Sequence, residues 1–352
     1  MPNPLIGVFY HWLGGLSSAS FYVPYRGVRG WNWEVLWLTG GLFSWLVAPW
    51  LFAAVMTRDL TGVLAHTPAP VAGLCILFGA LWGFGGLTYG LTMRYLGLSL
   101  GMAVVLGLCT VFGTLIPPIV AGDLATKLLD TTSGRIILLG LAVTLAGIIV
   151  VAVAGARKNA ALGEAEKAAA VAEFNFRKGI GVAIFSGIMS SCFAFGLAAG
   201  EPVRALSAAA GTGPLWTGLP VLCLVMFGGL VTNALWCAVL ILRNRSGAQW
   251  LGRAAATAER PALARNYLLA GLGGTLWYFQ FFFYTMGESQ MGRLGFSSWT
   301  LHMASIIIFG TLWGFAFREW KGTRAGVRAT VWGGIMLLVG ATVIIGYGNS
   351  LV

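Results

Sequence analysis

Two histidines are the ionisable side chains that lie deepest in the apolar stretches of this sequence. His11 and His302 each occupy the interior of an apolar run, whereas no Asp, Glu, Lys or Arg falls in the middle of any run. Histidine gains and loses a proton near neutral pH. Ionisable groups at such depth usually face a bundle interior or a water-filled cavity. Both imidazoles are therefore candidate proton carriers. The alternative for each is a structural imidazole bonded to a serine or a backbone carbonyl.

A second group of residues has the spacing of a sugar-binding helix face. Trp277, Gln280 and Tyr284 follow i, i+3 and i+7, and Glu288 extends the same stripe. An aromatic ring covers the apolar face of a pyranose, while amide, hydroxyl and imidazole groups bond its hydroxyls. Ordinary packing or lipid contact is the alternative, but a buried Gln280 needs a partner. The expected substrate-binding residues are Trp277, Gln280, Tyr284, His302, Trp82, Tyr89 and Ser18.

The elements that must position these residues are apolar helices. Ten runs of about 20 residues alternate with short polar breaks, which is the length needed to cross a bilayer as a helix. Only 9% of residues are charged and 58% are hydrophobic. The sequence therefore predicts an all-α polytopic membrane protein whose partner is the lipid bilayer rather than nucleic acid. The expected spans are 5–24, 34–56, 71–93, 99–120, 134–154, 179–200, 214–242, 266–287, 297–317 and 327–347.

The basic residues are unevenly divided between the two sets of loops. Lys and Arg number 17 in the loops that follow odd-numbered runs and 5 in the others. Cytoplasmic loops carry the excess of Lys and Arg in membrane proteins. The odd loops are therefore expected to be cytoplasmic, and both termini are expected to be periplasmic or external.

Matching residues recur between the two halves of the chain. Trp82 and Tyr89 recur as Trp277 and Tyr284, both displaced by 195 residues. Five runs in each half would place the halves in opposite orientation, an arrangement common in secondary transporters. The expected organisation is two inverted five-helix repeats, 1–156 and 179–352, joined by a cytoplasmic linker, 157–178, that forms a short surface helix.

Several longer motifs carry a resemblance to a known family. Gly79 to Gly101, GALWGFGGLTYGLTMRYLGLSLG, Leu276 to Tyr284, LWYFQFFFY, and Trp299 to Met303, WTLHM, resemble the bacterial L-rhamnose/proton symporter family of the drug/metabolite transporter superfamily. The resemblance extends over essentially the whole chain. It implies ten helices, inner-membrane localisation and proton-coupled uptake of a 6-deoxyhexose. Small proton-coupled members of the superfamily place a proton-binding carboxylate midway along their first helix, so His11 is its positional counterpart.

The function expected from the sequence is proton-coupled import of L-rhamnose or a close 6-deoxyhexose. An exporter of the same superfamily and a membrane sugar sensor that does not translocate remain alternatives. His11 and His302 are the expected proton-coupling residues, and carboxylates at the span edges, Glu34, Glu201 and Glu288, rank second. No enzyme signature such as HExxH, CxxC or GxSxG occurs. Neither a metal nor an organic cofactor is expected, and H⁺ is the expected coupling ion. The sequence does not predict the oligomeric state.

Overall fold

The computed structural model describes residues 2–96, 98–161, 175–253 and 262–351, and this part of the chain contains helices and no strands. Eight of its helical segments are long and apolar enough to cross a membrane. The prediction of a polytopic helical membrane protein is therefore confirmed. The eight segments are Trp33–Met56, Ala69–Met93, Gly101–Val120, Thr132–Lys158, Phe176–Ala209, Leu219–Asn244, Leu294–Ala316 and Ala325–Ser350.

The helix boundaries agree with most of the expected spans to within a few residues. The long helices are α1 (Pro4–Ser20), α6 (Ala69–Leu96), α7 (Leu98–Val120), α8 (Thr132–Ala160), α10 (Phe176–Ala199), α12 (Leu219–Asn244), α13 (Leu263–Ser289), α14 (Ser298–Ala316) and α15 (Ala325–Ser350). The second expected span is built from α3 (Trp33–Leu42), a π-helical turn η1 (Phe43–Val47) and α4 (Ala48–Met56). The expected surface helix of the linker falls largely on 162–174, outside the described residues.

Short helices appear mostly in segments predicted to be loops, whereas α2 (Tyr22–Tyr25) lies at the end of the predicted span 5–24. The others are α5 (Leu60–His66), η2 (Ala125–Leu129), α11 (Glu201–Ala209), η3 (Ser246–Leu251) and η4 (Gly292–Ser297). Pro202 stands at the start of α11, where its missing N–H has no helical partner to lose. The new helix turns Arg204 toward the bundle, with 14% of its side chain exposed.

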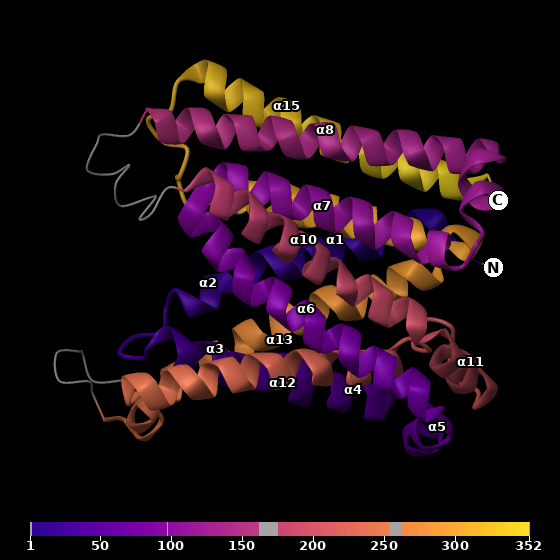
Figure 1. Cartoon of the computed structure of the whole chain (residues 1–352), viewed down its shortest axis with the longest axis horizontal. Helices are drawn as coiled ribbons and strands as arrows, with labels where there is room; N and C mark the ends of the chain where they lie inside the picture. The colour runs from indigo at the N-terminus through magenta and orange to yellow at the C-terminus, as the bar shows by residue number, and fades with distance from the viewer. Residues whose placement is uncertain (1, 97, 162–174, 254–261, 352) are drawn as a thin grey trace.

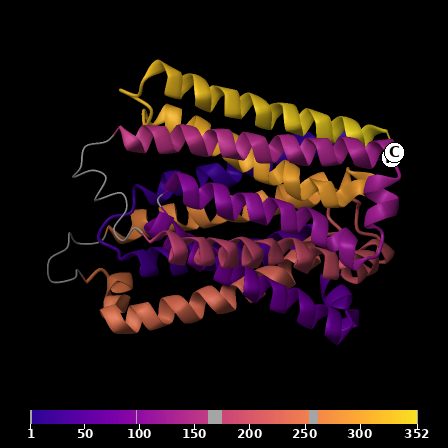
Figure 2. The same cartoon turned by 45° about the horizontal axis from the view of Figure 1, so that its top comes forward.

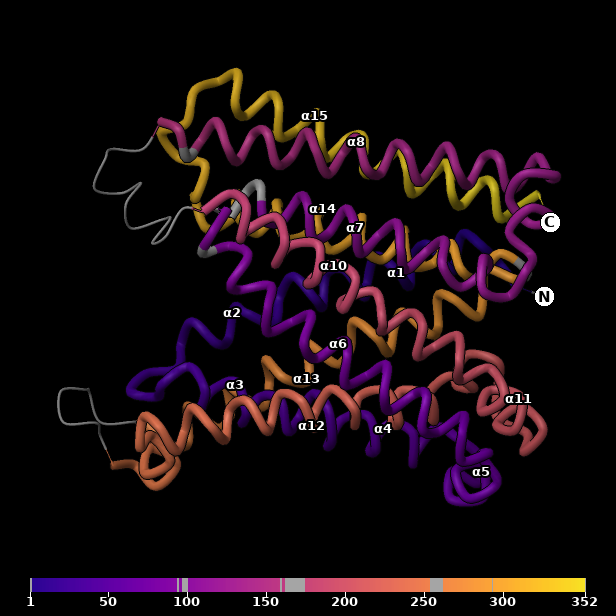
Figure 3. The backbone as a smooth tube through the Cα atoms, viewed as in Figure 1, coloured from indigo at the N-terminus to yellow at the C-terminus, as the bar shows by residue number. Residues whose placement is uncertain are grey.

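Two expected spans do not meet the length and composition criteria on their own. Helix α1 has 17 residues, and α13, although 27 residues long, is polar in its middle because of Gln280 and its Trp and Tyr residues. Both lie within the body of the bundle (Figure 3). Helix α1 packs against α13 and α14. Neighbouring helices cover one face of each, while side chains such as Phe9 on α1 and Leu268 on α13 stay exposed.

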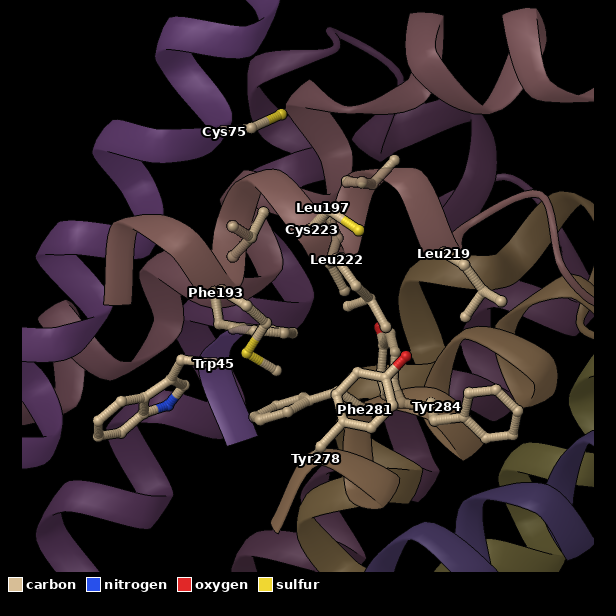
Figure 4. Packing of buried hydrophobic residues seen from close by; sticks show 14 of the residues in the cluster. Trp45, Cys75, Phe193, Leu197, Leu219, Leu222, Cys223, Tyr278, Phe281 and Tyr284 are labelled. Carbon is tan, nitrogen blue, oxygen red and sulfur yellow. The ribbon is translucent and has the colours of Figure 1, made fainter. Parts of the chain in front are cut away.

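The packing of the long helices is extensive and regular. Helix α10 packs against α6 and α7, α6 also packs against α12, and α8 packs against α15. Figures 1 and 2 show α8 and α15 side by side along one edge of the molecule. A large buried cluster joins α6, α10, α12, α13 and α14. In Figure 4, side chains from this cluster, including Phe193, Phe281 and Tyr284, point into the space between the helices.

The two ends of the bundle differ in what they carry. Both chain termini lie at one end, together with α5 and α11 (Figure 1). Helices α8 and α12 end at the opposite end, next to Arg157, Lys158 and Arg243. The termini and these basic helix ends therefore lie at opposite ends of the bundle.

Candidate functional site

The structure brings the two buried histidines together. His11 on α1 and His302 on α14 have ring centroids 6.5 Å apart, and neither side chain is exposed. The ring of Tyr284 on α13 lies edge-on to both, 5.3 Å from each centroid. Three residues separated widely in sequence thus form one cluster, called the histidine cluster below: His11, Tyr284 and His302.

Glycines make this approach possible. A Cβ atom at Gly287 would lie 2.8 Å from the His11 ring, and one at Gly14 would lie 2.8 Å from the carbonyl oxygen of Gln280. The Gly14 position also faces Nδ1 of His302 at 3.4 Å. Small residues let helix backbones approach closely in membranes. Helix α1 can therefore seat His11 between α13 and α14.

The imidazoles of this cluster lack ordinary partners. Both ring nitrogens of His11 and both of His302 are buried without a hydrogen bond in the part of the chain that the structure describes. A buried polar group without a partner costs free energy. These four nitrogens are therefore available to a polar ligand or a proton. The structural alternative, an imidazole bonded to a serine or a carbonyl, has no such bond among the described residues.

Two further aromatic rings pack against the histidine cluster. Trp299 lies 5.8 Å from Tyr284 and 6.2 Å from His302 between ring centroids, and Phe281 lies 6.1 Å from His302. The indole nitrogen of Trp299 donates to the carbonyl of Cys109 at 3.0 Å. The sequence analysis did not single out Trp299 as a site residue. Its position three residues before His302, on the same helix face, was the available signal.

A cavity leads toward this cluster from one end of the bundle. It has a volume of about 750 Å³ and is lined by residues of α7, α10, α11, α13 and η4. Tyr284 lines its inner part, whereas His11 and His302 are not among its lining residues. The cavity lies at the end that carries both termini, where α11 is found (Figure 1). Its volume falls in the range typical of small-molecule sites.

An ion pair forms part of the cavity wall. Nη2 of Arg204 on α11 contacts Oε2 of Glu288 on α13, and Oε2 of Glu201 lies 3.9 Å from Arg204 Nε. The side chains of Arg204 and Glu288 are 14% and 18% exposed, against 76% for Glu201. From the sequence, Glu201 and Glu288 are expected at the edges of spans. It gave no signal that Arg204 and Glu288 would pair.

The remaining predicted residues of α13 lie further along the helix from the cavity than Tyr284. Gln280 is 2% exposed, and its Nε2 donates to the carbonyl of Trp277 at 3.0 Å. Trp277 packs against Phe21 with ring centroids 4.5 Å apart, and its indole nitrogen has no partner among the described residues. Trp277, Phe21 and Trp37 line a small void of about 10 Å³. The stripe therefore runs from the cavity wall into the closed part of the bundle.

The other predicted residues are spread over a larger region. Trp82 on α6 packs against Phe193 and Phe281, at 4.9 and 5.4 Å between ring centroids. Ser18 is buried on α1, 5% exposed. Tyr89 packs against a separate cluster of Leu96, Val105 and Ala183. The structure thus groups His11, Tyr284 and His302, connects Trp82 to them through Phe281, and sets Tyr89 apart.

Polar contacts join helices at the end of the bundle opposite the cavity. Oε1 of Glu34 accepts hydrogen bonds from Asn32, Asn244 and Ser246 at 2.8 to 3.1 Å. The amide of Asn266 bonds both the backbone N–H and the carbonyl of Arg29. These contacts tie the start of α3 to α12, and the segment before α3 to α13. Among the described residues, the open cavity therefore lies at the terminus-bearing end, and these polar contacts join α3, α12 and α13 at the other.

The cysteines pack as small buried residues. All five are free and buried, as their placement in apolar runs predicts. Among the described residues, no group of three or more His, Cys, Asp and Glu is arranged to hold a metal ion. The chemistry of the site therefore lies with imidazole, phenol, amide and ion-pair groups.

Comparison with known proteins gives one family. The family model described as L-rhamnose-proton symport protein matches residues 1–350. The chain is 35% identical over 347 residues to an L-rhamnose-proton symporter of Mannheimia succiniciproducens and 36% identical over 347 residues to one of Salmonella gallinarum. Each alignment covers 98% of both chains. This is a family of transporters, not enzymes, so the prediction of a non-enzymatic protein is confirmed.

Proposed function

Because the chain belongs to the L-rhamnose-proton symport protein family, we propose that it imports L-rhamnose or a close 6-deoxyhexose together with protons across the inner membrane. The proposed site rests mainly on one observation. The imidazoles of His11 and His302 are buried without hydrogen-bond partners among the described residues, and they contact Tyr284, which lines an open cavity. A neutral sugar gains nothing from the membrane potential, so concentrating it requires a coupled ion. Histidine can supply the proton-binding group near neutral pH.

Uptake measurements test this function directly. Proteoliposomes that contain the purified chain should accumulate labelled L-rhamnose when the outside is more acidic, and accumulation should stop when the gradient is collapsed. A drug or metabolite exporter would show no such uptake, and a sugar sensor would bind L-rhamnose without translocating it. Neither alternative is favoured by a specific observation. Absence of accumulation by well-folded protein would reject the proposal.

We propose ten membrane-spanning helices arranged as two inverted five-helix repeats. Helices at corresponding positions in the two halves have corresponding packing partners. The proposed pairs are α1 with α10, α3–α4 with α12, α6 with α13, α7 with α14 and α8 with α15. The contacts of α1 with α13 and α14 correspond to those of α10 with α6 and α7. The contact of α6 with α12 corresponds to that of α13 with α3. This symmetry of packing supports the repeat and the inclusion of α1 and α13 among the spans.

We place the sugar between the cavity and the histidine cluster. Tyr284, Gln280 and Trp277 would bind it along one face of α13, with His302 beside them and Trp82 behind Phe281. Ser18 and Tyr89 remain proposed substrate-binding residues; of the whole proposed set, Tyr284 alone is among the residues that line this cavity. The proposed proton carrier is His11, which lies against Gly287 and Tyr284. His302 is proposed chiefly to bind sugar.

A further inference from the structure

The Arg204–Glu288 ion pair stands at the boundary between the cavity and the buried imidazoles. Glu288 lies one helical turn after Tyr284 on α13, and both line the cavity together with Arg204. Gly287, next to Glu288, touches the His11 ring on the other side. The pair therefore lines the cavity next to Tyr284, the residue that contacts both imidazoles.

Arg204 has hydrogen-bonding capacity that its partner does not use. A guanidinium carries five N–H donors, arranged to bond two adjacent oxygen atoms at once. The structure shows one hydrogen bond, to Glu288, and Nε has no hydrogen-bond partner among the described residues although Glu201 lies 3.9 Å away. Neighbouring hydroxyls of a sugar are suitable acceptors. A sugar in the cavity would therefore compete with Glu288 for Arg204.

We propose that the Arg204–Glu288 pair couples sugar to proton: the bound sugar takes hydrogen bonds from Arg204, and Glu288, no longer neutralised, accepts a proton from cavity water. This inference rests on the proposed function and deepens it. The proton comes from a hydronium ion supplied by the more acidic outside solution: one of its O–H bonds breaks, an O–H bond forms on a carboxylate oxygen of Glu288, and a neutral water molecule remains in the cavity. When the cavity closes, the proton passes to His11, and Glu288 is again ionised.

Sugar binding to Arg204 and protonation of Glu288 favour each other, because each removes the ion pair that opposes the other. An opposite charge in contact favours the ionised form of a carboxylate. A protonated Glu288 has no charge to hold Arg204, which leaves Arg204 free for the sugar. By linkage, each ligand then favours binding of the other by the same factor. The charged and titratable groups around Glu288 are Arg204, Glu201, Tyr284, His11 and, on the cavity rim, Asp123 and Lys127.

The test is the pH dependence of L-rhamnose binding to the purified full chain. In the wild type, affinity should rise as pH falls, by at most about tenfold per pH unit for one linked proton. Glu288→Gln keeps the shape but removes both charge and titration. This variant should bind at the wild type's low-pH affinity at every pH. Asp130→Asn, which removes an exposed carboxylate outside the cavity lining, should retain the wild-type dependence.

His11→Gln separates this inference from the proposed function. That variant should keep pH-dependent binding while losing proton-driven accumulation. A Glu288→Gln variant with the wild-type pH dependence would overturn the coupling role of the pair. If His11→Gln alone loses the pH dependence of L-rhamnose binding, His11 takes up the proton directly. That result would also overturn the coupling role of the pair. If the wild type binds no L-rhamnose at any pH, the proposed function fails, and the inference fails with it.

Infrared difference spectroscopy gives a readout that does not depend on a variant folding. Adding L-rhamnose to the wild type should produce a new C=O band of a protonated carboxyl group. The same band should be present in Asp130→Asn and absent from Glu288→Gln. A wild-type spectrum that shows no newly protonated carboxyl on sugar binding would overturn the proposal.

Discussion

At the scale of single residues, His11 and His302 share a cluster but have different surroundings. His11 lies against the Gly287 backbone and Tyr284, whereas His302 also lies beside Trp299 and Phe281. His11→Gln keeps a hydrogen-bonding side chain but removes the titration. We expect sugar accumulation driven by a pH gradient to fail in this variant, while sugar-for-sugar exchange, which moves no net proton, persists. His302→Gln should mainly weaken binding. Unchanged accumulation in His11→Gln, with the wild-type pH dependence, would exclude His11 as the carrier.

Gln280 gives a second prediction at the residue scale. Its side chain is 2% exposed and holds the carbonyl of Trp277. Gln280→Ala should leave any sugar hydroxyl bound there without a partner, while the Trp277 carbonyl, inside α13, keeps its helical hydrogen bond. We expect L-rhamnose binding to weaken by roughly 1–3 kcal/mol, measured by titration calorimetry. Trp277→Ala should also weaken binding, whereas Trp236→Ala, on an indole that is 50% exposed on α12, should not. Normal affinity in folded Gln280→Ala and Trp277→Ala would move the site elsewhere.

At the scale of elements, the contact between α1 and α14 depends on the absence of side chains. A Cβ at Gly15 would lie 2.6 Å from the carbonyl carbon of Ser305, which is backbone and cannot rotate away. Gly15→Ala should therefore force the helices apart and destabilise the protein by about 1–3 kcal/mol, the usual cost of overpacking. Thermal unfolding in detergent measures the change. Gly340→Ala, on α15 with open space around its Cβ, should be neutral or slightly stabilising. Equal stability of the two variants would contradict this packing.

At the scale of the whole molecule, the charge distribution predicts the orientation in the membrane. Both termini lie at the cavity end, and α8 and α12 end at the opposite, basic end (Figure 1). Reporter fusions within 157–178 and 243–265 should behave as cytoplasmic, and a fusion after Val352 as external. The cavity would then face the outside, as an importer ready to bind sugar requires. A cytoplasmic C-terminus would reverse the orientation and point the cavity toward the cell interior.

The sequence by itself determined the class of protein, its family resemblance and most helix boundaries. A run of about 20 apolar residues has one common structural solution in a bilayer, so 34–56 and 214–242 are close to the observed Trp33–Met56 and Leu219–Asn244. It also identified the two deep histidines, because an ionisable group in an apolar run is rare.

Only the tertiary structure decided which of the predicted residues meet. The spacing of residues along a helix predicts which side chains share a face, but it does not predict what packs against that face. Tyr89 and Tyr284 therefore have equivalent positions in the sequence pattern, although of the two it is Tyr284 that contacts the histidines. The Arg204–Glu288 pair joins residues 84 positions apart, one of them on α11, a short helix that the sequence analysis did not predict. Such contacts are set by how closely helices approach, and here that depends on glycines whose neighbours come from distant parts of the chain.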